Sequence, residues 1–188
     1  MLKVNPTVFA VNKNYQIVIP VNEQSFAKII VDGQEYYSES NGMARCSADI
    51  HKIDVPADKL NAAGEYKVCL RPVKERRWYG ADTGEEKEYT FRFFAPPAEN
   101  LRFYNISDAH SLVKEPIDAG RVFGKIDALF LCGDVMDNCD KVESFMNVYE
   151  ICSALTGGSI PVVSARGNHD MRGRLADRFA DYMPSAAG

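Results

Sequence analysis

The fold of this chain is decided by residues 126–165, which read IDALFLCGDVMDNCDKVESFMNVYEICSALTGGSIPVVSA. Two short apolar runs, 126–132 and 160–165, flank residues 141–156, in which apolar side chains recur at helical spacing. Gly157 and Gly158 follow the helical stretch, as is common where a helix ends. The segment therefore predicts a strand, a helix and a second strand that runs parallel to the first.

The same alternation continues on both sides of this segment. An apolar run at 101–106 and a helical pattern at 112–123 precede it, and a helical pattern at 171–182 follows it. Residues 99–188 therefore predict a βαβαβα order, which is typical of a mostly parallel sheet.

The first half of the chain has a different pattern. It shows short apolar runs separated by turn residues such as Asp32-Gly33, and no long helical period, which favours an all-β sandwich over residues 1–95. His51 falls in one run, where we expect it to be exposed to solvent. Pro96 and Pro97 then mark a linker between two domains. The seven candidate strands are 7–11, 15–21, 26–31, 34–37, 48–55, 64–72 and 88–94.

Composition narrows the class of protein. Of the 188 residues, 46% are hydrophobic and 26% charged, which excludes a disordered, collagen-like or coiled-coil chain. No apolar run reaches the roughly 18–20 residues of a membrane span, so we expect no membrane partner. The net charge of −4 disfavours nucleic acid as a partner. Residues 98–188 hold 9 of the 22 basic and 13 of the 26 acidic residues, so the acidic excess lies in the second half.

The N-terminus and the cysteines bear on location. The start of the sequence contains no apolar core of the length of a secretory signal, so we expect a cytoplasmic protein. Five cysteines with no C-x-x-C pair favour reduced thiols.

Residues that suit metal ions follow each of the three strands predicted in the second half. Functional residues of open α/β sheets gather beyond the carboxyl ends of the strands. Two of the three histidines of the chain are found there, with aspartates and an asparagine. This donor set suits Mn, Fe or Zn. The three groups are Ser107-Asp108-Ala109-His110, Gly133-Asp134-Val135-Met136-Asp137-Asn138 and Gly167-Asn168-His169-Asp170.

The order Asp-x-His, Gly-Asp-x-x-Asp and Gly-Asn-His-Asp resembles the calcineurin-like metallophosphoesterase superfamily, over about residues 99–183. The resemblance implies an α/β domain of four αββα layers, of which this chain contains the first half. The β-rich residues 1–95 resemble, by position and pattern, the immunoglobulin-like or fibronectin-like domain of purple-acid-phosphatase-like members.

The resemblance also implies a role for each matching residue. Asp108 and His110 bind the first of two divalent metal ions, Asp134 bridges both ions, and Asn168 binds the second. His169 contacts the phosphate or protonates the leaving group, and Asp170 orients it. The implied reaction is hydrolysis of a phosphomonoester or phosphodiester by a hydroxide that bridges the metals.

Other residues around these motifs have open roles. We expect Asp137 to lie beside the ligands rather than among them. Arg166, Arg172 and Arg174 either contact a substrate phosphate or offset the charge of nearby aspartates.

The sequence also departs from the family pattern. Three further histidines complete the site in the superfamily, and none follows His169 here. We therefore expect an N-terminal fragment, inactive alone, whose partner is the missing C-terminal half of the catalytic domain. Apolar faces at 126–132 and 160–165 should be partly uncovered and prone to aggregation.

Three other interpretations remain open. The aspartates could cap helices without binding any metal. The β-sandwich could act as a non-catalytic binding module beside a remnant α/β part. A second polypeptide could supply the missing histidines.

Overall fold

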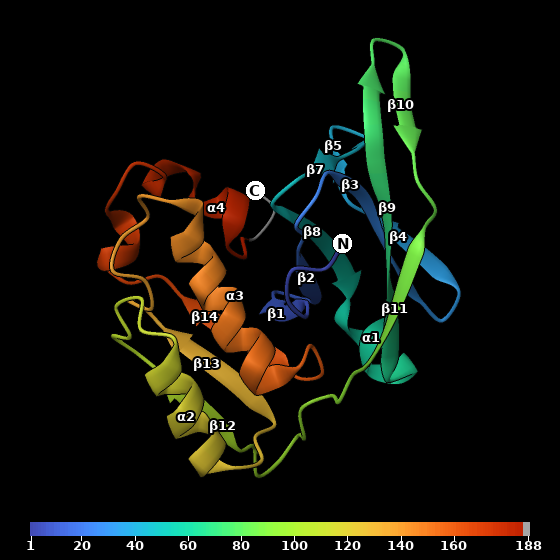
Figure 1. The fold of residues 1–188 in the computed structure, drawn as a ribbon. Coiled ribbons are helices and arrows are strands. Elements are labelled where there is room, and N and C mark those ends of the chain that lie inside the picture. Colours follow the sequence, from blue (N-terminus) through green and yellow to red (C-terminus); the bar gives the residue numbers. More distant parts are fainter. Residues whose placement is uncertain (186–188) are drawn as a thin grey trace.

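A six-stranded sheet forms the centre of the structure, a computed structural model that describes residues 1–185 (Figure 1). The strand order is β12-β13-β14-β1-β2-β8. Strands β12, β13, β14 and β1 run parallel, whereas β2 and β8 are antiparallel to their neighbours. The bounds are Phe103–Ile106 for β12, Ala128–Cys132 for β13, Pro161–Ala165 for β14, Thr7–Val11 for β1, Asn14–Pro20 for β2 and Ile50–Pro56 for β8.

The sheet joins both sides of the predicted domain boundary. Strand β1 pairs with β14, with Val8 opposite Pro161 and Phe9 opposite Val162. Pro96 and Pro97 lie in a segment that is free of helix and strand. The predicted division into 1–95 and 99–188 therefore does not separate two sheets, because pairing with β14 satisfies the backbone groups at the edge of β1.

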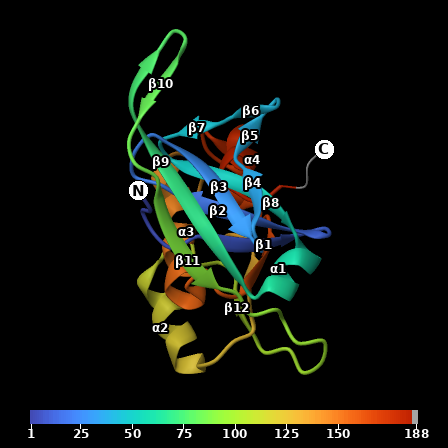
Figure 2. The same cartoon turned by 90° about the vertical axis from the view of Figure 1, so that its right-hand side faces the viewer.

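A second sheet comes entirely from the first half of the chain. Its path is β10-β9-β3-β4, and β11 and β7 pair with β9 and β3. The hairpin of β9 and β10 projects beyond the rest of the molecule (Figures 1 and 2). The bounds are Gly80–Thr83 for β10, Glu65–Arg77 for β9, Ser25–Val31 for β3, Gln34–Tyr37 for β4, Lys87–Arg92 for β11 and Cys46–Ser47 for β7; Glu39–Ser40 (β5) pairs separately with Met43–Ala44 (β6).

The second sheet packs on the β1-β2-β8 part of the first. Alternate side chains of each strand point to opposite faces, so the inward set from both sheets forms one apolar core. Ile17 and Ile53 from the first sheet and Ile29 and Leu70 from the second are at most 2% exposed. Leu60 of α1 (Ala57–Ala63), a helix that the sequence did not predict, closes one end of this core.

Helices cover the other face of the six-stranded sheet. Helices α2 (Lys114–Phe123) and α3 (Val142–Thr156) were predicted from their apolar spacing. The stripe on α3 includes Phe145, Tyr149 and Cys152, all fully buried. Gly157 adopts the left-handed conformation and ends α3, as expected.

One part of the six-stranded sheet has an open face. Leu129 and Leu131 of β13 point into the helix-covered core, so Phe130 lies on the opposite face by alternation. There Phe103 is 48% exposed and packs at a tilt against Phe130, with ring centroids 4.7 Å apart. Val163 is 36% exposed on β14. The uncovered apolar surface expected from the sequence is therefore present.

The helix predicted at 171–182 is wrong. The chain instead forms the short 3₁₀ turns His169–Met171 and Ala176–Arg178 and the helix α4 (Phe179–Tyr182). Gly173, with φ of +101°, breaks the helical path, and a Cβ there would lie 2.7 Å from the backbone nitrogen of Asp140. Close packing against the loop that precedes α3 therefore overrides the local helical pattern.

His51 is also placed differently from the prediction. It lies on β8 and is fully buried rather than exposed. Its Nδ1 is 3.0 Å from the hydroxyl of Ser38, and its Nε2 is 3.3 Å from that of Ser25. Burial, with the charge of Arg45, lowers the pKa of His51 to about 4, so the ring is neutral at pH 7.

No helix among residues 1–185 combines the length and apolar character of a membrane span.

Candidate metal centre

The three polar groups predicted at strand ends meet at one edge of the sheet. Strands β12, β13 and β14 are parallel and in register, with Ile106 opposite Leu131 and Cys132 opposite Ala165. The loops that follow them therefore begin side by side at the carboxyl ends of the strands.

The first two loops are held together by backbone hydrogen bonds. The N–H of Asp108 donates to the carbonyl of Gly133 at 3.2 Å, and that of His110 donates to the carbonyl of Asp134 at 3.1 Å. Asp108, His110 and Asp134 have φ angles of 55°, 46° and 51°. This left-handed conformation is uncommon for residues other than glycine, and its clustering is typical of functional sites.

A glycine allows the third loop to approach the second. A Cβ on Gly167 would lie 2.2 Å from Oδ1 of Asp134 and 2.4 Å from its backbone nitrogen. The N–H of the next-but-one residue, His169, donates to Oδ1 of Asp134 at 2.7 Å. The contact between these loops thus requires glycine at position 167.

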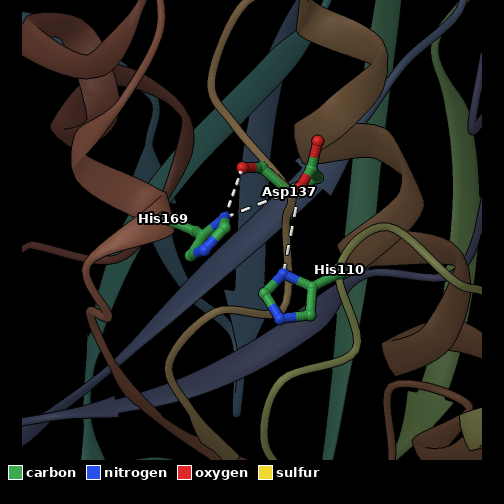
Figure 3. A group of neighbouring side chains, drawn as sticks. All are labelled: His110, Asp137 and His169. Carbon is green, nitrogen blue, oxygen red and sulfur yellow. Dashed lines mark hydrogen bonds and ion pairs between the residues drawn. The ribbon is translucent and has the colours of Figure 1, made fainter.

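His110, Asp137 and His169 face one another across the three loops (Figure 3). Oδ1 of Asp137 lies 3.9 Å from Nδ1 of His110 and 3.5 Å from Nδ1 of His169. One ligand atom from each residue lies within 4.8 Å of the others. The ring centroids of His110 and His169 are 4.4 Å apart, and the rings are arranged edge to face. The imidazole of His110 and the carboxylate of Asp137 at this spacing can hold one divalent cation, with the ring of His169 beside them.

Asp108 lies at the margin of this cluster. Its Oδ1 is 3.9 Å from Nε2 of His110, on the other side of the ring from Asp137, and its side chain is 66% exposed. The hydroxyl of Ser107 donates to its other oxygen. Asp108 is therefore near His110, as the motif implies, but outside the group of three.

Asp134 and Asn168 form a second part of the site. The carboxylate of Asp134 accepts from the N–H of His169 through Oδ1, and its Oδ2 lies 2.9 Å from one terminal atom of the Asn168 side-chain amide. The other terminal atom of that amide lies 2.9 Å from Nη2 of Arg172. The side chains of the two predicted ligands thus contact each other.

Asp170 lies behind the site rather than in it. It is 3% exposed, and its Oδ2 accepts from the N–H of Gly167 at 2.8 Å and from that of Asp134 at 3.1 Å. The side chain of Arg166 donates to the carbonyl of Asp170 at 2.9 Å. The carboxylate of Asp170 therefore holds the loops together.

Asp137 takes the place that the family resemblance gives to Asp170. Nδ1 of His169 lies 2.9 Å from the backbone carbonyl of Asp137 and 3.5 Å from its carboxylate. Sequence reasoning placed Asp137 only beside the ligands. One feature of the sequence could have indicated that Asp137 contacts the histidines. It lies three residues after Asp134, in a loop that must turn past both of them.

Comparison with known proteins agrees with this fold. A family model described as calcineurin-like phosphoesterase matches residues 101–187, the part of the chain that holds the three motifs. No curated protein matches the chain.

Among solved structures, the chain is similar to the purple acid phosphatase PPD1 from yellow lupin (Lupinus luteus) seeds. The similarity has a TM-score of 0.50 at 12% identity and covers 98% of this chain but 40% of the lupin chain. It supports a shared fold of mixed α/β type, over about two fifths of the length of that enzyme. A protein from Archaeoglobus fulgidus also matches, with a TM-score of 0.30 and 13% identity, over 48% of this chain and 94% of that chain.

Proposed function

We propose that this chain carries the first part of the active site of a metal-dependent phosphoesterase that hydrolyses phosphomonoesters or phosphodiesters. The observation that carries the proposal is the meeting of His110, Asp137 and His169, from three separate loops, within 4.8 Å. The calcineurin-like family match over the same loops supports it.

The residues present fit a divalent metal ion. The donor set of imidazole nitrogens and carboxylate oxygens suits Mn, Fe or Zn. We assign His110 and Asp137, with Asp108 beside them, to the first ion, and Asp134 with Asn168 to the second. When bound, such ions stabilise charge on phosphate oxygens and activate water.

His169 is the residue that we assign to proton transfer at the leaving oxygen. Nδ1 of its ring lies 2.9 Å from the carbonyl of Asp137, and a carbonyl can only accept, so this nitrogen carries a proton. Nε2 is then the atom that can exchange a proton with a substrate. Asp137 fixes the orientation of the ring, while Asp170 keeps the loops of Asp134 and Gly167 in contact.

The rest of the proposal concerns the whole protein. We propose that residues 1–95 contribute an immunoglobulin-like or fibronectin-like sandwich, that the protein is cytoplasmic, and that turnover requires ligands beyond those on this chain.

Binding of Mn²⁺, followed by titration calorimetry, tests the site. We expect His110→Ala and Asp137→Ala to weaken binding by about tenfold to hundredfold. Asp49→Ala, which removes an exposed aspartate on the first half of the chain, is the matched control and should bind as the unaltered chain does. Equal affinity in all four proteins would refute the assignment.

Hydrolysis of p-nitrophenyl phosphate with added Mn²⁺ tests turnover separately. We expect the 188-residue chain to bind ions without turnover. Turnover by this chain that is lost on Asp134→Ala would contradict the need for further ligands while supporting the phosphoesterase assignment.

A further inference from the structure

The hairpin of β9 and β10 ends in two exposed aromatic side chains. Trp78 is 95% exposed and Tyr79 is 68% exposed, and their ring centroids lie 5.2 Å apart. They stand at the point of the hairpin tip, residues 74–82, which projects beyond the rest of the molecule (Figures 1 and 2). Single exposed apolar residues are common on any surface, whereas a cluster of them at a projecting point indicates a contact site.

The backbone of the hairpin tip is paired almost to its end. Arg77 and Gly80 are partners in the antiparallel ladder, so the turn consists of Trp78 and Tyr79 alone. The apolar part of a bilayer offers no partners for backbone N–H and C=O groups, so a segment that enters it must satisfy these groups internally. The two-residue turn leaves few such groups free, and the two rings can enter a lipid surface ahead of the backbone.

Basic residues flank the two rings. Three basic and two acidic residues give the hairpin tip a net charge of +1, whereas the whole chain has a net charge of −4. Arg77 donates to both acidic side chains, to Glu75 at 3.1 Å and to Asp82 at 2.6 Å. Lys74 and Arg76 are exposed, and neither forms an ion pair in the described part of the chain. These two charges are therefore available to an anionic surface.

The size and charge of the hairpin tip favour a membrane over other classes of partner. A stable interface between proteins buries roughly 800 Å² on each side, more than two side chains supply. Single-stranded nucleic acid is bound in a positively charged groove that follows its backbone, and a net charge of +1 on a projecting tip forms no such groove. Trp and Tyr rings, by contrast, prefer the headgroup region of a bilayer, because each has an apolar body and a polar group.

We propose that the hairpin tip binds the surface of an anionic lipid bilayer, with Trp78 and Tyr79 in the headgroup region and Lys74 and Arg76 facing lipid phosphates. The absence of a membrane partner was predicted from the lack of a spanning run, and a peripheral contact needs no such run. The proposal is independent of the proposed function, because the hairpin tip lies on the second sheet and the candidate metal centre lies at strand ends of the first.

Fluorescence of Trp78 tests the contact directly, because Trp78 is the only tryptophan of the chain. EDTA in the buffer prevents lipid phosphate from binding through a metal ion at the candidate metal centre. We expect vesicles of equal parts phosphatidylserine and phosphatidylcholine to shift the emission to shorter wavelength and to protect the ring from quenching by acrylamide. Vesicles of phosphatidylcholine alone should bind more weakly, and high salt should remove the difference.

Sedimentation with the mixed vesicles compares variants of the hairpin tip. We expect the double variant Trp78→Ala, Tyr79→Ala to bind at least about tenfold more weakly, because two large apolar side chains no longer leave water. The double variant Lys74→Ala, Arg76→Ala should bind about fivefold more weakly for each charge removed. All four side chains are exposed, so we expect these variants to fold as the unaltered chain does.

Matched controls remove the same chemistry elsewhere on the surface. Phe123→Ala removes an aromatic side chain of α2 that is 55% exposed. The double variant Lys13→Ala, Lys59→Ala removes two exposed charges; Lys59 lies on α1, at the opposite end of β9 from β10 (Figure 1). Both controls should bind vesicles as the unaltered chain does.

Four results would overturn the proposal. Two are an unchanged emission spectrum with anionic vesicles, and equal vesicle binding by the tip variants and the controls. An emission shift that grows with protein concentration without lipid would indicate a second copy of the chain as the partner. A shift with single-stranded oligouridylate but not with vesicles would indicate RNA. Because the tip variants should bind Mn²⁺ as the unaltered chain does, the proposed function is tested separately.

Discussion

The two halves of the six-stranded sheet differ in what covers them. The half formed by β1, β2 and β8 lies between a helix layer and a second sheet, and its polar His51 is fully buried with two serine partners. The parallel half, β12-β13-β14, is covered by helices on one face only, and its polar groups gather at the strand ends. The half of the sheet formed by β1, β2 and β8 thus contributes stability, whereas the half formed by β12, β13 and β14 carries the candidate site at its strand ends, which we call the reactive edge.

The largest effect that tests this comparison is the change in the free energy of unfolding when one aromatic side chain is removed from each half of the sheet. Phe9 on β1 is fully buried against Tyr149, and Phe103 on β12 is 48% exposed. We expect Phe9→Ala to lower the free energy of unfolding by about 3–5 kcal/mol. Phe103→Ala should cost about 1 kcal/mol, mostly its contact with Phe130. Urea denaturation measures both, and equal losses would refute the difference between the halves.

Low pH should lower the free energy of unfolding through protonation of His51, which lies in the half of the sheet that is covered on both faces. Its pKa falls from 6.5 to about 4 on folding, so the unfolded chain binds the proton more readily. The stability from the neutral ring is fully present above pH 6.5 and is lost as the pH falls toward 4. The expected loss is about 3 kcal/mol, from 1.4 kcal/mol per pKa unit.

Urea denaturation at pH 7 and pH 4 measures this effect. His51→Asn is the control, since its amide does not titrate in this range. A pH dependence of equal size in both proteins would show that His51 is not its source.

The loop contact at the reactive edge should tolerate no side chain at position 167. A Cβ on Gly167 would overlap Asp134, whereas one on Gly80 would meet no atom within 4 Å. We expect Gly167→Ala to cost about 1–3 kcal/mol in stability and to weaken Mn²⁺ binding. Gly80→Ala should change stability by less than about 0.5 kcal/mol. Thermal melts and Mn²⁺ titration measure the pair, and unchanged Mn²⁺ affinity in Gly167→Ala would argue against the loop contact.

The smallest expected effect is a difference in the rate at which a thiol reagent labels two cysteines. Cys132 at the end of β13 is exposed, while Cys152 on α3 is fully buried and burial raises its pKa to about 12. A thiol reagent at pH 8 should label Cys132 first, because the thiolate is the reactive form. Cys132→Ser should remove the fast phase. Fast labelling of Cys152 in the native protein would contradict its burial.

Much of the fold could be predicted from local pattern. The strand at 7–11 and the strand at 34–37 match the structure at both ends, since alternation and turn residues act over a few positions. Helix α3 was also found, because its apolar stripe is long. The helix predicted at 171–182 failed because Gly173 packs against the neighbouring loop, a contact that no local pattern contains.

The candidate site divides in the same way. Asp108, His110, Asp134, Asn168 and His169 were predicted as a group because each follows a parallel strand, and the structure brings them to one edge. The position of Asp137 between two histidines depends on how its loop turns, which residue types do not specify. The contact of Arg172 with Asn168 depends on the short 3₁₀ turn that replaces the predicted helix.

The sequence by itself determined the order of strands and helices over residues 101–165 and the residue types at each strand end, because periodicity and composition are local properties of a chain. Only the tertiary structure decided that β1 joins β14, that His51 is buried and that Asp137 faces both histidines. The physical reason is that alternation shows a strand to have two faces but not what will cover them. Burial and pairing depend on segments far apart in the chain, and these meet only in the folded molecule.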